Sequence, residues 1–329
     1  MIAMKRIAGI IAVLLIIAAI LVAGCTTTPS NNSSSPATGT SGKIIVSGAF
    51  ALYPMMMKWA EEYNKVHPDV RIDVSAGGAG KGMTDALSGM VDLGMVSREI
   101  YPEEANQGAV WVAVTKDAVV VTASSENPVL ADLQSKGINQ SVFRQIFVNE
   151  TIRTWGQVVN HPDVKEKINV YTRSDACGAA DVWAKYLGFK QENLQGVGVF
   201  GDPGLADAVK SDHLGVGYNN IGFAYDANTG KPLDGLAIIP LDQNDNGKVD
   251  PDEQVYATRD VIVNAINTGK YPSPPARELN LVAKGSFSGP TLQFVRWILT
   301  DGQQYVEESG YITLPKERID EQLGKLIAN

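Results

Sequence analysis

The chain has 329 residues and a formal net charge of −8, with 44 % hydrophobic and 19 % charged residues. Its length suits two compact lobes better than one core, and its composition excludes a disordered polymer and a wholly membrane-embedded protein. The negative charge argues against a general nucleic-acid binder, because affinity for phosphate backbones needs clustered positive charge. The two cysteines allow one disulfide at most, which excludes a disulfide-stapled scaffold.

The N-terminus has the features of an export signal. Lys5 and Arg6 precede an uninterrupted apolar run that ends in small residues directly before Cys25. This ending resembles the lipobox of prokaryotic lipoproteins, so we predict a lipoprotein signal peptide over residues 1–24 and anchoring to the outer face of the cell membrane through Cys25. The alternative is an uncleaved single-pass anchor, since about 18 apolar residues just span a bilayer. Both interpretations place the remaining chain outside the cytoplasm.

Residues 25–42 are rich in Ser, Thr, Asn and Pro and lack a periodic apolar signal. Such a composition buries too little apolar surface to offset the entropy of ordering, which predicts a flexible tether. The folded part is expected to begin near Lys43. If Cys25 carries the lipid, Cys177 has no partner in its own chain and is predicted to be a shielded free thiol.

Short runs rich in β-branched residues alternate with amphipathic stretches through the rest of the chain. Strands are predicted over 43–47, 70–74, 109–115, 118–123, 237–241 and 279–283, and helices over 55–66, 182–187 and 291–299. In the first helix Met55, Trp59, Tyr63 and Val66 share one face, which predicts core packing. The alternation predicts an α/β fold without an internal repeat.

Three glycine-containing loops, 47–51, 77–82 and 173–179, each lie between a predicted strand and a predicted helix. Glycine permits close backbone approach, and the start of a helix offers unpaired N–H groups and the positive end of its dipole. Three such ends directed at one point form an anion site without a metal, to which Arg98 and Arg173 add charge-assisted bonds. Each loop taken alone is more often a simple turn.

Several segments resemble the substrate-binding lipoproteins of phosphate-specific ABC transporters. They are 43–60, 74–100 and 172–188, which contain the three loops, and the later 271–279, 297–303 and 310–311. The resemblance covers nearly all of 43–314. It implies a type II periplasmic-binding-protein fold, in which two α/β lobes are joined by a two-strand hinge. Lobe I would comprise 43–116 and 236–329 and lobe II 117–235, with chain crossings near 115–118 and 234–237.

The resemblance also implies which residues meet the ligand, with Asp175 orienting Arg173. Those residues are Phe50, Ala51, Ala79, Gly80, Ser97, Arg98, Arg173, Cys177, Gly178 and Ala179. The sequence departs from the family pattern at several of these positions, because Ala49, Phe50, Ala51, Ala79, Cys177 and Ala179 stand where the family commonly has hydroxyl residues, and Lys81 where threonine is frequent. Each missing hydroxyl donor removes a bond of about 1 kcal/mol or more to a desolvated anion.

The function implied by the resemblance is capture of phosphate between the lobes of a monomer and its delivery to the permease subunits of an ABC importer, without catalysis. The missing hydroxyl donors keep another oxyanion or a phosphorylated small molecule open as the ligand of a scavenger or sensor with the same fold. A third possibility is a secreted thiol hydrolase that uses Cys177. His67, His161 and His213 are far apart in the sequence and lack metal-ligand spacing.

Residues 242–253 resemble a calcium loop of the EF-hand kind. Oxygen side chains fall at loop positions one, three, five, nine and twelve, with Gly247 at six and Val249 at eight. We predict that this loop holds a structural Ca²⁺ and staples an insertion in lobe I. The predicted metal residues are Asp242, Asn244, Asn246, Lys248, Asp250 and Glu253. The alternative is an acidic surface turn stabilised by Asx side chains.

Overall fold

The computed structural model describes residues 42–328. The predicted signal peptide, Cys25 and the predicted tether up to residue 41 lie outside the described residues. Among residues 42–328, none of the helices has both the length and the apolar character needed to cross a bilayer.

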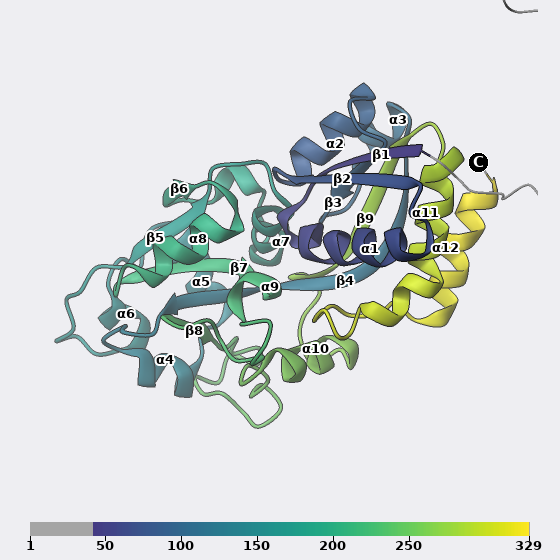
Figure 1. Cartoon of the computed structure of the whole chain (residues 1–329). Helices are drawn as coiled ribbons and strands as arrows, with labels where there is room; N and C mark the ends of the chain where they lie inside the picture. The colour runs from purple at the N-terminus through teal and green to yellow at the C-terminus, as the bar shows by residue number, and fades with distance from the viewer. Residues whose placement is uncertain (1–41, 329) are drawn as a thin grey trace, which may run out of the picture. The chain divides into compact units, whose positions relative to one another are not determined.

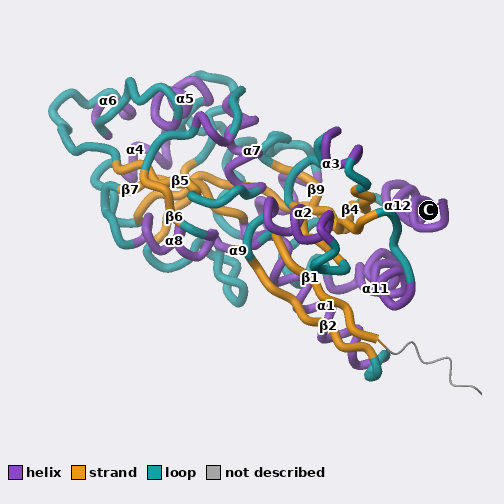
Figure 2. Tube along the Cα trace, turned by 90° about the horizontal axis from the view of Figure 1, so that it is seen from above, coloured by secondary structure: helices purple, strands orange, loops and turns teal. Residues whose placement is uncertain are grey.

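The strands form one hydrogen-bonded set in which parallel and antiparallel pairs are mixed (Figures 1 and 2). The strand order is β2-β1-β3-β9-β4-β7-β5-β6, and β8 also pairs with β4. The strands are β1 (Gly42–Gly48), β2 (Val70–Ala76), β3 (Leu93–Val96), β4 (Ala109–Ser124), β5 (Asn169–Arg173), β6 (Val197–Val199), β7 (Gly215–Asn220), β8 (Leu236–Ile239) and β9 (Ala276–Lys284).

Helices alternate with the strands, which confirms the α/β class predicted from the sequence. The α-helices are α1 (Tyr53–Val66), α2 (Ala79–Ser88), α3 (Pro102–Asn106), α4 (Leu130–Lys136), α5 (Gln140–Phe147), α6 (Trp155–Val159), α7 (Gly178–Leu187), α8 (Gly201–Lys210), α9 (Ile221–Ala224), α10 (Arg259–Asn267), α11 (Gly289–Leu299) and α12 (Lys316–Ala328). Short 3₁₀ helices are η1 (Phe50–Leu52), η2 (Gln191–Asn193) and η3 (Asp301–Tyr305).

The long strand β4 connects the two halves of the fold. The sequence predicted two strands here, but the structure has one of 16 residues with an irregularity between Ala113 and Thr115. Up to Ala118 the strand pairs with β9, and from Val119 it pairs with β7 and β8. Because both β4 and β9 lie at the boundary, two strands join the halves, as the resemblance implied.

Two hydrophobic cores divide the fold into two lobes. The first lobe is built around Trp59, Tyr63 and Phe294, and the second around Trp155 and Trp183. Each of these side chains is 0 % exposed, so each lobe has an apolar interior of its own. The apolar face of α1 packs into the first core as predicted, except for Val66, which ends the helix and is 61 % exposed.

The prediction that residues 236–275 belong to the first lobe is wrong. β8 pairs with Val121–Ser124, on the distal half of β4, and Ile238, Ile239 and Leu241 are buried in the second core. Tyr271 also lies in the second core, whereas Leu279 lies in the first, so the chain returns between these two residues. The calcium-type loop 242–253 therefore belongs to the second lobe. A strand that spans both lobes offers two pairing sites, and the composition of β8 does not distinguish them.

Candidate anion site between the lobes

The three glycine-containing loops come together at the boundary between the lobes. In the first lobe, the Gly77 and Gly78 N–H groups donate to the Gly48 carbonyl at 2.8 and 3.0 Å. The Gly80 N–H donates to the carbonyl of Ala176 in the second lobe at 2.9 Å. The first, second and third loops are thus linked in turn by backbone hydrogen bonds, and the N–H of Gly80, a predicted ligand residue, is taken by Ala176.

Glycine is needed where the loops approach one another. A Cβ atom at Gly178 would lie 2.1 Å from the Ser97 carbonyl oxygen, so no other residue fits this contact without a shift. A Cβ atom at Gly80 would lie 2.7 Å from the Ala176 Cβ. Gly78 has a φ of +92°, a conformation that L side chains rarely adopt. The glycines of the second and third loops therefore reflect close packing of one lobe against the other, whereas Gly48 of the first loop packs against Met95 and Gly82 of its own lobe.

Helix N-termini gather at the same boundary. α2 begins at Ala79, α7 begins at Gly178, and η1 leads from Phe50 into α1. The first N–H groups of a helix have no intrahelical partner, and the helix dipole adds partial positive charge there. A fourth helix, α8, begins at Gly201, whose N–H donates to Asp175 Oδ1 at 3.2 Å. Sequence reasoning missed this fourth helix.

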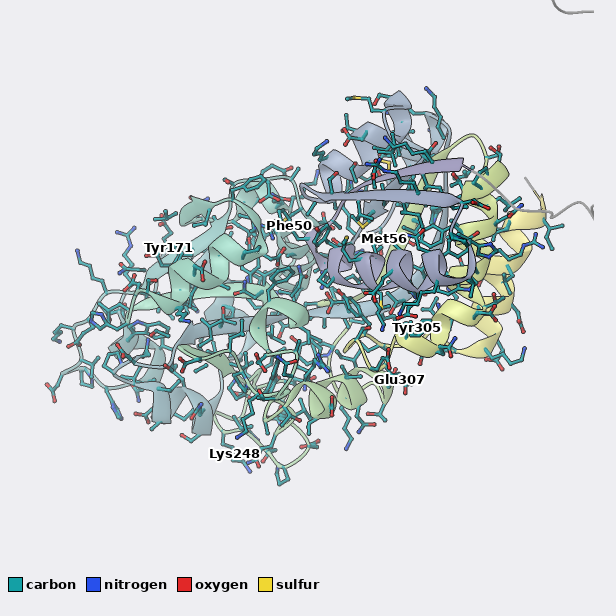
Figure 3. The ribbon with its side chains drawn as sticks, viewed as in Figure 1. Phe50, Met56, Tyr171, Lys248, Tyr305 and Glu307 are labelled. Carbon is teal, nitrogen blue, oxygen red and sulfur yellow. The ribbon has the colours of Figure 1, made fainter. Side chains whose placement is uncertain are left out.

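Arg173 is held between two carboxylates. Its Nε and Nη2 donate to Asp175 at 2.8 and 2.6 Å, and its Nη1 donates to Asp202 at 2.5 Å. The side chain is 0 % exposed, and burial opposes its charge, but Asp202 and Asp175 outweigh burial and raise the pKa of Arg173. The Phe50 ring lies 5.5 Å from the guanidinium (Phe50 is labelled in Figure 3). The predicted pairing of Arg173 with Asp175 is present, whereas the pairing with Asp202 was not predicted from the sequence.

Arg98 is occupied differently from the prediction. Its Nη1 and Nη2 donate to both carboxylate oxygens of Glu104 on α3, at 2.9 and 2.6 Å. Its guanidinium also lies over the Tyr101 ring, 4.1 Å from the centroid. The side chain therefore braces α3, and its role as a charged partner of the anion stays a prediction. A local i,i+6 carboxylate competes successfully with a more distant site for the same bidentate donor.

Side chains beyond Arg98 form two further bridges between the lobes. Tyr101 Oη donates to Asp181 Oδ1 on α7 at 2.5 Å. Lys185, also on α7, lies 2.6 Å from Glu99. Both bridges join the segment after Ser97 to the helix that begins at Gly178, so they hold together two segments that carry predicted ligand residues.

Comparison with known proteins supports the fold. Residues 33–301, well over half of the chain, match the family described as PBP superfamily domain. The chain belongs to the PBP superfamily. Phosphate-binding protein PstS of Pseudomonas aeruginosa is 26 % identical over 311 residues, which cover 88 % of each chain. Phosphate-binding protein PstS of Methanocaldococcus jannaschii is 25 % identical over 338 residues, which cover 83 % of each chain. A substrate-binding protein structure from Clostridium perfringens with bound phosphate has a TM-score of 0.67 at 23 % identity, covering 83 % of this chain and 100 % of the other.

In this PBP-superfamily chain Cys177 serves as the cap of α7. Its Sγ accepts from the Ala180 N–H at 3.4 Å, and its own N–H donates to Gln191 Oε1 at 3.3 Å. Burial, opposed by the charge of Arg173, raises the pKa of the thiol to about 12. The side chain is a free cysteine, as predicted, and stays protonated at neutral pH. A protonated thiol is a poor nucleophile, which disfavours the hydrolase interpretation.

The calcium-type loop folds around its two end carboxylates. Asp242 accepts from the N–H groups of Asn246 and Gly247 at 3.2 and 2.9 Å, and Glu253 accepts from those of Gln243 and Asp250 at 2.7 and 3.1 Å. Asp242 and Glu253 are 4 % and 3 % exposed. Within residues 42–328, no three His, Cys, Asp or Glu side chains converge as a metal site would require.

The side chains in the middle of the loop bond to one another. Asp250 accepts from the side-chain amides of Asn244 and Asn246 and lies 2.5 Å from Lys248 Nζ (Lys248 is labelled in Figure 3). These contacts, that of Lys248 first, lower the pKa of Asp250 to about 2. The Asp250 carboxylate is therefore ionised at neutral pH, as a calcium ligand must be.

Proposed function

We propose that this protein captures phosphate between its lobes and delivers it to the permease of an ABC importer. The observation that carries the proposal is the meeting of the three loops around the buried Arg173. The name of the P. aeruginosa relative and the bound phosphate in the C. perfringens structure support phosphate as the ligand. A similar fold in an ABC-type phosphate transport receptor from Vibrio cholerae, with a TM-score of 0.60 at 19 % identity, covering 83 % of this chain and 100 % of the other, supports the importer as the partner.

Backbone donors supply most of the anion site in this proposal. The N–H groups of Phe50, Ala79, Gly178 and Ala179, at or near helix starts, would donate to phosphate oxygens, together with the Ser97 hydroxyl. Arg173 is already balanced by Asp175 and Asp202, so the helix ends must contribute more of the attraction than the arginine. An anion that contacts both lobes stabilises their closed arrangement, which is how binding would be signalled to a permease.

Anion titrations test the proposal directly. We expect phosphate to raise the melting temperature of the protein and to give a measurable heat of binding, and sulfate, molybdate and glycerol phosphate to do so less. Arg173→Ala should abolish the response, because it leaves Asp175 and Asp202 unpaired under the loops. Arg153→Ala is the control for loss of an arginine, since the Arg153 side chain is exposed and donates to the Glu150 carbonyl away from the three loops. A stronger response to glycerol phosphate than to phosphate would instead assign the site to a phosphorylated small molecule.

We also propose that loop 242–253 binds a structural Ca²⁺ in the second lobe. The support is the match of the oxygen side chains and Gly247 to the positions of a calcium loop, with Asp242 and Glu253 buried at its two ends. Calorimetry should show calcium binding by the wild type and by Asp252→Asn, whose exposed side chain is not in the predicted ligand set. Glu253→Gln should lose it. No heat with the wild type would leave the loop as an Asx-stabilised turn.

Extracytoplasmic location and lipid anchoring are part of the same proposal. They rest on the sequence of residues 1–25. Metabolic labelling with a fatty acid should mark the wild type and not Cys25→Ser, and the variant should be released from the membrane fraction. Retention of Cys25→Ser in the membrane would favour the uncleaved anchor. Size-exclusion chromatography with light scattering tests the expected monomer.

A further inference from the structure

A buried ion pair lies where the two connecting strands cross the lobe boundary. Asp117 of β4 and Arg277 of β9 face each other in the antiparallel register, with 3.5 Å between Arg277 Nη2 and Asp117 Oδ2. The side chains of Arg277 and Asp117 are 6 % and 4 % exposed. Arg277 Nη1 and Asp117 Oδ2 are buried without a hydrogen-bond partner among the described residues. The contact between the two side chains therefore uses only part of their hydrogen-bonding capacity.

The guanidinium of Arg277 contacts both lobes. Its Nε donates to the Ser97 carbonyl of the first lobe at 3.2 Å, and its Nη2 donates to Asn220 Oδ1 at the end of β7 in the second lobe. Asn220 Nδ2 donates in turn to Asp202 Oδ1 at 2.6 Å, and Asp202 accepts from Arg173. A continuous hydrogen-bonded path therefore joins Ser97 to Arg173 through Arg277.

The next residue pair on the same strands faces the other way. Lys116 lies opposite Glu278 in the register, and successive side chains of a strand point to opposite faces. Glu278 is held by Arg318 of α12 in a two-bond contact at 2.6 and 2.9 Å. Arg318 of α12 therefore has an ion pair of its own with strand β9, and it takes no part in the path from Ser97 to Arg173.

We propose that Arg277 is a positioning residue of the anion site, which holds the Ser97 carbonyl and the Asn220 side chain together and thereby sets the closed arrangement of the lobes. The inference rests on the proposed phosphate binding. A guanidinium presents its N–H groups in a fixed planar fork, whereas an ammonium is a compact point charge. Only the guanidinium bonds both acceptors at once, so lysine does not replace arginine in this role.

Phosphate titration of four proteins tests the proposal. Arg277→Gln and Arg277→Lys are both expected to weaken phosphate binding about tenfold or more relative to the wild type, the effect of losing a charge-assisted hydrogen bond. Arg318→Gln is expected to stay within about twofold of the wild type, because it breaks an ion pair outside the path. Full affinity in Arg277→Lys would mean that only the positive charge matters and would overturn the bridging role.

Hydrogen exchange gives a second readout that does not depend on the ligand. The Gly80 N–H is bonded to the Ala176 carbonyl across the lobes, so exchange in peptides covering Gly77–Gly82 reports the closed arrangement. Without phosphate, Arg277→Gln should speed this exchange and Arg318→Gln should not; equal exchange in both would overturn the inference. If the wild type fails to bind phosphate, the proposed function fails while this measurement still decides the role of Arg277. Should Arg277→Gln not fold, the Asp117→Asn/Arg277→Gln double variant, which removes the unpaired carboxylate, takes its place.

Discussion

The burial of Asp117 predicts an unusual pH dependence of stability. Burial, opposed by Arg277, raises the pKa of Asp117 from 3.8 to about 6. Between these two values the folded protein binds a proton that the unfolded chain has already released. The stability that this proton contributes is fully present below pH 3.8 and is lost as the pH rises through about 6. At about 1.36 kcal/mol per pKa unit, the loss by pH 7 amounts to about 3 kcal/mol.

The substitution Asp117→Asn isolates this contribution. Asparagine does not titrate, and all other groups titrate in both proteins, so their effects cancel in the difference. The free energy of unfolding of the variant minus that of the wild type should rise by about 3 kcal/mol from pH 3.5 to pH 7. The attraction to Arg277 acts only on the ionised carboxylate and is already contained in the pKa of Asp117, so replacing the neutral acid by the amide adds only a pH-independent offset.

Urea unfolding at half-unit pH intervals measures this difference curve. Asp69→Asn, on the exposed turn before β2, controls for the removal of a carboxylate as such. A difference curve for Asp117→Asn that is flat between pH 3.5 and 7 would mean that the carboxylate is not desolvated at the lobe boundary.

Three further predictions concern the contacts between the lobes. Gly178→Ala should weaken phosphate binding by about 1–3 kcal/mol, because the new Cβ meets the Ser97 carbonyl at 2.1 Å and prevents full closure. Calorimetry measures the affinity, and an unchanged value would show that the lobes need not approach so closely. Tyr101→Phe removes the hydrogen bond to Asp181 and should weaken phosphate binding by about 0.5–1.5 kcal/mol through faster release of phosphate. Stopped-flow dissociation measures the release rate, and an unaltered rate would contradict this expectation. Cys177→Ser should strengthen binding by a similar amount, because a hydroxyl donates to an oxyanion better than a buried thiol; equal or weaker binding in competition titrations would place residue 177 out of reach of the anion.

Much of the fold was predictable because local patterns determine it. The strands β1 and β2 and the helices α1 and α11 follow from β-branched runs and 3.6-residue periodicity in the sequence. The three glycine turns were also visible, since glycine is required wherever one backbone touches another. These features need only short-range information.

The features that sequence reasoning missed depend on choices between distant partners. The point at which the chain returns from the second lobe to the first was misplaced, because β8 has two possible pairing sites along β4. Only the packing of the second core selects one of them. Asp202 and Arg277 gave no local signal, because their partners lie far away in the sequence.

In the proposed site, backbone N–H groups at the lobe boundary hold the anion, and NMR of ¹⁵N-labelled protein observes these groups one by one. On titration with phosphate, we expect the largest amide shifts at Phe50, Ala79, Gly178 and Ala179. The contradicting result would be a spectrum that is unchanged at millimolar phosphate, or one whose largest shifts lie in the calcium-type loop.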